Sequence, residues 1–500
     1  MLTQNDFINI EKQATAVYES LELEIIEEIA TRIAKVGYAN TVVLNDIQIA
    51  QEMGILYQDI ITLVAKYNNT SYEKVAEIFE QAGAKTLKFD DKIYTEAGLN
   101  PLPINQSPSM VQMLNATIEK TAGNLQNLVM TTANTAQTQF YNAMNKAYME
   151  VSTGVKSYSQ SILDAIDDIS SQGADITYPS GRKRSLESAV RMNIVTGVNQ
   201  TCGKLQELRA DEVGYDLFEI TAYSGARPSH AKWQGKIVSR SGQKGYLTLK
   251  DIGYGEATGF KGVNCHHDWY PYKEGSARTY TQEQLDAWKN EKVTYNGKEY
   301  SKYDATQLQR AMERRIRADK KELAGLQGIL TSAKDNKLIE DTRTEFGRRS
   351  LLYKTHQNEL DDFIQQTSLR KDITRLYVGK QDKNISTQVA NVTKIANKYN
   401  KSDIVGSKIN GIKITEIGEH IISRTYARNV SFEDVQDTLK KPVKYGKIRA
   451  NKTQQIKGKN CTIIVNTETG KLVTVYPKKT KKGMILWKLM INLMKDKLNY

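Results

Sequence analysis

Cysteine, proline and long apolar stretches are all scarce in this sequence of 500 residues. Its three cysteines, Cys202, Cys265 and Cys461, are too few and too scattered for a disulfide framework, and they fit a reducing compartment. No run of about 18 apolar residues occurs, which argues against a membrane span. Residues 1–30 have neither a basic start nor an apolar centre, so we expect neither a signal peptide nor a membrane anchor there. These absences predict a protein that is made in the cytoplasm and does not cross a membrane.

Positive charge is concentrated at one end of the chain. The formal net charge is +13, and residues 401–500, with 21 basic and 8 acidic residues, account for all of it. Residues 1–400 contain 49 basic and 49 acidic residues and are neutral overall. Such a basic region is typical of a domain that binds a polyanion, although charge that only keeps a domain soluble would look the same. Within it, residues 481–500 form an amphipathic basic tail, which we expect to dock on its own domain; a helix on a membrane surface is the alternative.

Most of the chain has the apolar spacing of helices. Between residues 21 and 33, six apolar residues can share one broad helix face: Leu21, Leu23, Ile25, Ile26, Ile29 and Ile33. We expect an N-terminal helical region over 1–97, a linker over 98–110 that holds three of the eight prolines, and long helices over 111–214. A charged helical hairpin is expected over 278–375, followed by a second linker over 376–402.

Two regions differ from this helical background. In residues 215–277 glycine is frequent, and Phe218, Ile220 and Ala222 alternate with polar residues, which predicts a strand in a compact, turn-rich module. Residues 403–480 read as a strand, two short helices and an antiparallel meander. The expected fold class is therefore multidomain and mainly α, with a small turn-rich α+β module and a C-terminal α+β domain.

The turn-rich module holds side chains that can either ligate a metal or build irregular turns. Its candidate residues lie in two short motifs: Arg227, His230, Trp233, Gly235, Asn264, Cys265, His266 and His267. The paired elements of closed zinc sites are missing, and consecutive side chains on an extended chain alternate in direction, so at most two of the last three can face one ion. We interpret the motifs as architectural and expect neither a metal nor a cofactor, with a metal-dependent enzyme as an alternative.

These motifs resemble those of a known family. "YSGARPSHAKWQGK" followed by "GYGEATGFKGVNCHHDWYPYKEG" is similar to the phage minor capsid protein 2 family and, more distantly, to head-morphogenesis proteins such as the F protein of phage Mu. The resemblance covers roughly residues 1–375 and is strongest over 178–275. It implies a virion protein of a tailed phage, present in few copies in the head, that associates with portal and capsid proteins and with packaged DNA; ejection with the genome is one option. The distant relatives have a histidine and a later C-x-C pair, whereas this chain has His267 at the second position of that pair, which argues further against a shared metal site.

The C-terminal domain carries a second set of candidate residues. His420, Arg424 and Arg428 are spaced at i, i+4 and i+8, which places an imidazole and two guanidiniums on one helix face. Cleavage of RNA through its own 2′-hydroxyl needs a general base of near-neutral pKa and cations that stabilise the pentavalent phosphorus, and it needs no metal. Thr474 and Tyr476 alternate onto one face of the last strand, where their hydroxyls could position phosphate or ribose. A solvated face of a charged helix would show the same spacing.

A second resemblance concerns this domain. "EHIISRTYARNVSFEDVQDTLKKPVKYG" and "GKNCTIIVNTETGKLVTVYP" are similar to phage-borne nuclease-like domains grouped with barnase, EndoU, colicin and RelE toxins, over about residues 405–478. The active-site positions that this resemblance implies here are His420, Arg424, Arg428, Gln455 and Thr474. We therefore expect a virion protein whose C-terminal domain is a metal-independent ribonuclease acting on host RNA. Such an enzyme would need silencing in the producing cell, and an immunity partner is one option. The alternative is a structural protein whose basic domain clamps packaged DNA without catalysis.

Overall fold

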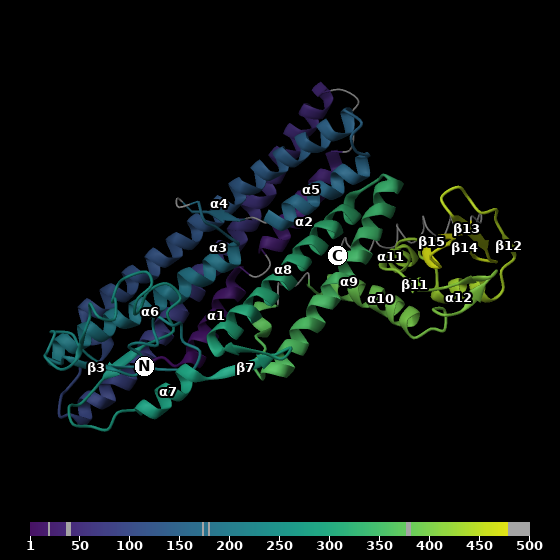
Figure 1. Cartoon of the computed structure of the whole chain (residues 1–500). Coiled ribbons are helices and arrows are strands. Elements are labelled where there is room, and N and C mark those ends of the chain that lie inside the picture. Colours follow the sequence, from purple (N-terminus) through teal and green to yellow (C-terminus); the bar gives the residue numbers. More distant parts are fainter. Residues whose placement is uncertain (19–20, 37–41, 173–174, 179–180, 377–381, 479–500) are drawn as a thin grey trace.

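The computed structural model describes residues 1–18, 21–36, 42–172, 175–178, 181–376 and 382–478. Long helices lie side by side in an elongated body, and a smaller α+β domain lies against one side of it (Figure 1). The fold class is the expected one, because a mainly helical chain carries a small turn-rich α+β module and a C-terminal α+β domain. Residues 479–500, which include the expected amphipathic tail, lie outside the described residues.

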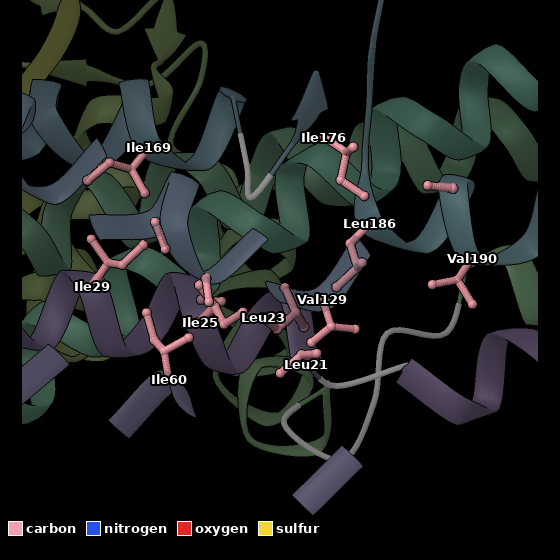
Figure 2. Packing of buried hydrophobic residues seen from close by; sticks show 14 of the residues in the cluster. Leu21, Leu23, Ile25, Ile29, Ile60, Val129, Ile169, Ile176, Leu186 and Val190 are labelled. Carbon is pink, nitrogen blue, oxygen red and sulfur yellow. The ribbon is translucent and has the colours of Figure 1, made fainter. Parts of the chain in front are cut away.

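Six helices build the first part of the body: α1 (Gln4–Tyr18), α2 (Leu21–Val36), α3 (Val42–Glu96), α4 (Pro108–Ser152), α5 (Tyr158–Gln172) and α6 (Leu186–Val213). The six apolar residues expected to share a face of α2 are all at most 1% exposed, as the spacing predicted. All of them except Ile26 meet apolar side chains from α3, α4, α5 and α6 in one cluster (Figure 2). Burial of each such side chain contributes roughly 1.5–3 kcal/mol, so this face fixes α2 in the body.

Short segments connect these helices. The proline-containing stretch after α3 holds only a short 3-10 helix, η1 (Ile104–Gln106), and the chain then reverses so that α4 packs against α3. Strands β1 (Ile176–Thr177) and β2 (Lys183–Arg184) pair between α5 and α6. Helix α6 begins where the Ser185 side chain accepts a hydrogen bond from the Ser188 backbone N–H, a standard N-cap.

The turn-rich module contains a four-stranded sheet in the order β5-β4-β3-β6. Its strands are β3 (Leu217–Ile220), β4 (Ile237–Ser239), β5 (Leu247–Thr248) and β6 (Trp269–Pro271). The predicted strand at 217–220 is present, but it does not expose a polar face. All four residues are buried, and the carboxylate of Glu219 accepts hydrogen bonds from the Thr279 N–H.

The charged region contains the expected helical hairpin and one element that the sequence interpretation missed. Helices α8 (Lys302–Ser332) and α9 (Asn336–Thr367) pack against each other, and α8 also packs on α2. Before them, α7 (Gln282–Asn290) leads into a β-hairpin of β7 (Lys292–Tyr295) and β8 (Lys298–Ser301). Its two-residue turn is Asn-Gly with positive φ at both residues, the strongest local signal for such a hairpin.

The expectation of a linker over 376–402 is wrong for most of that range. After the short 3-10 helix η2 (Ile373–Arg375), residues Asp382–Asn400 form helix α10. Buried apolar residues recur along it at helical spacing: Ile385, Val389, Val392, Ala396 and Tyr399. The polar composition concealed this sparse stripe, which packs against α9 and α11.

The C-terminal domain combines two short helices with a five-stranded sheet in the order β11-β15-β14-β13-β12. Helices α11 (Glu419–Ala427) and α12 (Phe432–Lys440) precede the predicted antiparallel meander: β12 (Lys444–Tyr445), β13 (Thr453–Lys457), β14 (Cys461–Asn466) and β15 (Lys471–Pro477). The single strand expected near residue 410 is instead three short ones, β9 (Lys408–Ile409), β10 (Ile412–Lys413) and β11 (Glu416–Ile417), and β11 pairs parallel with β15.

The C-terminal domain docks on the helical body through α11 and α9. At the crossing, a Cβ atom added to Gly347 would lie 3.0 Å from the Ser423 Cα, so the two backbones approach as closely as only glycine allows. Tyr426 of α11 packs on the core of the body, and Leu351 of α9 packs on the core of the C-terminal domain. Among the described helices, none is both long and apolar enough to cross a membrane.

Candidate functional site

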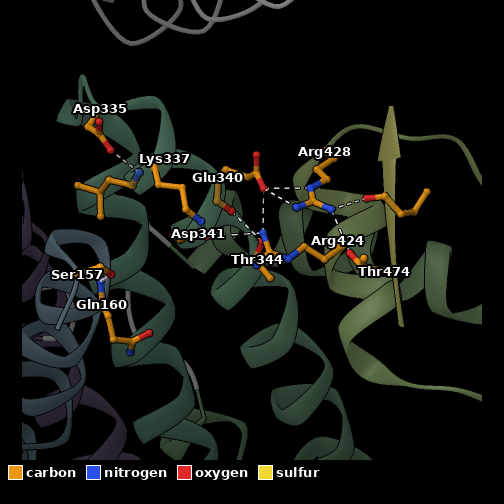
Figure 3. Close-up of polar contacts among 12 residues, drawn as sticks. Ser157, Gln160, Asp335, Lys337, Glu340, Asp341, Thr344, Arg424, Arg428 and Thr474 are labelled. Atoms are coloured by element: carbon orange, nitrogen blue, oxygen red, sulfur yellow. Dashed lines mark hydrogen bonds and ion pairs between the residues drawn. The ribbon is translucent and has the colours of Figure 1, made fainter. Parts of the chain in front are cut away.

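Four of the candidate residues of the C-terminal domain meet where α11 approaches β15. The Nη1 atom of Arg428 donates to the Thr474 hydroxyl at 3.0 Å and to the Val475 carbonyl at 2.5 Å. The guanidinium also lies over the Tyr476 ring, 3.9 Å from its centroid. Arg424 lies one turn earlier on the same face (Figure 3). The helix and the closing strand thus bring four of the predicted residues together.

A carboxylate of helix α9, that of Glu340, forms hydrogen bonds to both arginines. One oxygen of Glu340, Oε1, accepts from Arg424 Nη1 at 2.9 Å and from Arg428 Nε and Nη2 at 3.0 and 2.8 Å (Figure 3). Asp341 Oδ1 lies a further 3.6 Å from Arg424. The side chains of Arg424 and Arg428 are 17% and 10% exposed, and that of Glu340 is 36% exposed. The three side chains are therefore only partly accessible to solvent. Arginine forks bind carboxylate and phosphate oxygens in the same way.

His420 lies beside the pair and lines a cleft of about 980 Å³. The walls of the cleft come from α5, α8, α9, α11 and β15, and both Arg424 and Glu345 take part in them. Partial burial lowers the pKa of His420 below its usual 6.5, and the nearby charges of Arg424 and Arg428 lower this pKa further. The imidazole is therefore neutral at pH 7 and can accept a proton.

Gln455 does not join this cluster. It lies on β13, where it pairs with Ile464, and Ile464 pairs with Thr474. Gln455 is therefore in the same row as Thr474 but two strands away, roughly 9–10 Å at the usual strand spacing. The structure thus brings Arg424, Arg428, Thr474 and Tyr476 together and leaves Gln455 farther along the same sheet. His420 lies near the charges of both arginines and shares the cleft wall with Arg424.

The second group of candidates, in the turn-rich module, forms a buried cluster. His230 Nδ1 lies 3.3 Å from His267 Nδ1, and Cys265 Sγ lies 3.9 and 3.8 Å from these two nitrogens. All three residues are at most 1% exposed. His266 points the other way, because its Nε2 lies 3.2 Å from Glu11 Oε1 and its ring stacks on Phe7. Three ligating side chains are therefore gathered on one side of the chain.

Polar side chains and a glycine hold the two loops of the cluster in place. Arg227 donates to the carbonyls of Val263 and Asn264 at 3.1 and 3.2 Å, and Asn264 itself has a left-handed backbone with φ 52°. The amide of Asn199 donates to the carbonyls of Cys265 and His267. The remaining predicted residues also line these loops: the Trp233 ring lies 4.4 Å from that of His230, and Gly235 has φ 67°.

Burial keeps the three side chains of the cluster uncharged. It lowers the pKa of His230 to about 4 and that of His267 well below 6.5, and it raises the pKa of the Cys265 thiol. Both imidazoles are therefore neutral at pH 7, the form in which histidine binds metals.

Sequence reasoning missed the residues that support both sites. Glu340 lies 84 and 88 positions before its arginine partners, and no local pattern distinguishes it from the other acids of α9. Asn199 is a different case, because a polar residue on the apolar stripe of α6 is itself a signal. Gln206 and Arg209 lie on the same stripe and are also fully buried.

Comparison with known proteins agrees with the resemblance in the sequence. The family described as phage minor capsid protein 2 matches residues 2–365. A structural protein of Lactococcus phage LL-H is 30% identical over 284 residues, which is 53% of this chain and 73% of that protein. No solved structure matches the chain. The chain therefore belongs to the phage minor capsid protein 2 family and is a structural protein of the phage virion.

Proposed function

We propose that this head protein carries a metal-independent ribonuclease as its C-terminal domain, held closed by its own helical body. The observation that carries the proposal is the meeting of two guanidiniums and a hydroxyl, those of Arg424, Arg428 and Thr474. A neutral imidazole, His420, lies near both charges and lines a cleft together with Arg424. The family match extends to residue 365 and so does not reach this domain.

The Glu340 carboxylate marks the position that a phosphate would take. Its Oε1 atom accepts three charge-assisted hydrogen bonds from two arginines, the geometry expected for a phosphodiester oxygen. Arg428 is held for this task by Thr474, the Val475 carbonyl and the Tyr476 ring. Such a preorganised pair would stabilise the charge that develops on phosphorus.

The chemistry follows from these positions. His420 removes the proton of the ribose 2′-hydroxyl, and the oxygen attacks the adjacent phosphorus. The new O–P bond gives a 2′,3′-cyclic phosphate while the bond to the 5′-oxygen breaks, and that oxygen takes up a proton and leaves as a hydroxyl. DNA lacks the 2′-hydroxyl and would not be cleaved. Gln455, on the same sheet, would contact the RNA beyond the scissile phosphate.

Glu340 gives this ribonuclease a closed state. The carboxylate and an RNA phosphate compete for the same two arginines, so RNA must displace α9 or the domain must leave the body. This contact would limit damage to host RNA during head assembly, in addition to any immunity partner. Release from the body, for example during ejection with packaged DNA at the portal, would open the site.

The test compares RNA cleavage by the full-length chain and its variants. Glu340→Gln should increase the cleavage rate of a short single-stranded RNA about 10- to 100-fold, since a charge-assisted contact contributes about 1.5–3 kcal/mol. Glu359→Gln is the matched control, because Glu359 lies on the same helix, pairs with Arg315 instead and does not line the cleft. It should leave the rate unchanged.

Adding His420→Ala to the Glu340→Gln variant should abolish cleavage while RNA affinity stays nearly the same. If neither the wild type nor Glu340→Gln cleaves RNA, the ribonuclease proposal is wrong. Equal binding of RNA and DNA without cleavage would instead favour the nucleic-acid clamp.

A further inference from the structure

We propose that the turn-rich module binds one zinc ion through His230 Nδ1, Cys265 Sγ and His267 Nδ1. The sequence led us to expect no metal here, because paired ligand motifs are absent. The fold supplies the missing donor by bringing the turn at His230 against the extended Cys265–His267 segment. This site is separate from the proposed ribonuclease, and its test does not depend on RNA cleavage.

The donor atoms already have the spacing of a tetrahedral zinc site. Zinc–nitrogen bonds of about 2.0–2.1 Å and a zinc–sulfur bond of about 2.3 Å imply edges of about 3.3 Å between nitrogens and about 3.6 Å between sulfur and nitrogen. The observed nitrogen–nitrogen distance is 3.3 Å, and the sulfur–nitrogen distances are 3.9 and 3.8 Å. An ion can therefore enter with shifts of a few tenths of an ångström.

The surrounding hydrogen bonds leave both Nδ1 atoms without a proton. His230 Nε2 lies 2.9 Å from the Thr258 carbonyl, which can only accept, so this nitrogen carries the hydrogen. His267 Nε2 lies 3.2 Å from Gln234 Oε1, whose identity as oxygen is fixed by the Tyr223 backbone N–H that donates to it. Both imidazoles therefore direct a bare Nδ1 toward the same point.

Two lone pairs that face each other at 3.3 Å repel unless a cation or a donor lies between them. The Cys265 thiol can donate to only one of the two nitrogens, and its distances of 3.8 and 3.9 Å are long for such a bond. A metal ion satisfies both nitrogens and the sulfur at once. Carbonyl and amide oxygens bonded to the far nitrogens are also the usual partners of zinc-bound histidines.

The donor set selects the kind of ion. Two imidazoles and one thiolate suit zinc, whereas calcium and magnesium prefer oxygen ligands. Among the described residues, the group of side chains that could hold an ion consists of His230, Cys265 and His267, with no Asp or Glu. Water would then complete the tetrahedron. Because the ligands are at most 1% exposed and lie in loops with little regular structure, the ion would hold the module together.

The test measures metal in the purified full-length protein by inductively coupled plasma mass spectrometry. We expect about one zinc per chain and its loss in Cys265→Ser and His267→Ala. His266→Ala is the matched control and should keep the zinc, because that ring faces Glu11. Cobalt added to the metal-depleted wild type should give a thiolate charge-transfer band, a readout that needs no variant.

Three results would overturn the proposal. The first is a wild-type protein that neither contains zinc nor gives the cobalt band. The second is zinc retained at the same level in Cys265→Ser and His267→Ala, which would place the ion elsewhere. The third is zinc lost equally in His266→Ala, although circular dichroism shows that this variant is folded.

Discussion

The buried ion pair between Lys261 and Asp268 gives a sharp test of how the turn-rich module is built. Lys261 Nζ bonds Asp268 Oδ1, and the two side chains are 2% and 0% exposed. Asp268 Oδ2 also accepts from the Leu2 backbone N–H at 2.5 Å, so the pair ties the module to the start of the chain. Lys261→Met would leave a carboxylate unpaired in the interior, which costs about 3–5 kcal/mol.

The double variant Lys261→Met/Asp268→Asn should recover most of that loss. Asparagine keeps an oxygen for the Leu2 N–H and carries no charge, so we expect the double variant within about 1 kcal/mol of the wild type. Urea unfolding followed by tryptophan fluorescence suits this measurement, because Trp233 and Trp269 are buried in the module.

An exposed ion pair serves as the control for these variants. Lys292 and Glu299 lie 2.8 Å apart and are 62% and 63% exposed, so Lys292→Met should leave the free energy of unfolding nearly unchanged. The reasoning fails if Lys261→Met costs no more than this control, or if the double variant is no more stable than the single one.

Three further predictions concern pH and helix capping. In the Glu340→Gln background, the cleavage rate should fall as the pH drops through the lowered pKa of His420, which gives the pH–rate profile an acidic limb. Adding Arg424→Gln removes a neighbouring positive charge, so it should raise the pKa of His420 and move this limb to higher pH. Burial, with Glu28 and Glu24 nearby, raises the pKa of Glu27 to about 7 from an unfolded value of 4.5. Stability is therefore lost as the pH rises from 4.5 to 7 and stays reduced above pH 7. Glu27→Gln should be more stable than the wild type by about 1–3 kcal/mol at pH 8, and urea titrations should show this gain vanishing toward pH 4.5. Ser431→Ala removes the bond to the Asp434 N–H at the start of α12 and should cost about 1 kcal/mol, measured as faster hydrogen exchange in that helix.

Local sequence patterns predicted most of the helices and strands. The missed elements were those whose sequence signal was weak or was given too little weight. The apolar face of α2 and the antiparallel meander of the last strands were predicted from the sequence, because each depends on residues close in sequence. Helix α10 was missed because its apolar stripe is sparse. The β7–β8 hairpin was missed although its Asn296-Gly297 turn is a strong signal, because the charged sequence around it suggested a helix.

In the two candidate sites, the sequence likewise showed which residues share one helix face or strand side, but not which residues of distant elements join them. Helical spacing placed Arg424 and Arg428 on one face, and strand alternation allowed Cys265 and His267 to share a side. Neither pattern could supply Glu340 or His230, because their approach depends on how separate elements pack. The two sites therefore needed the fold, even though most of their residues were visible in the sequence.

The ends of the RNA products test the central proposal most directly. Mass spectrometry of a short RNA treated with the Glu340→Gln protein, without added divalent metal, should find 2′,3′-cyclic phosphate and 5′-hydroxyl ends, and none when His420→Ala is added. Intact RNA, or products with 3′-hydroxyl ends, would contradict a ribonuclease that uses the 2′-hydroxyl of its substrate.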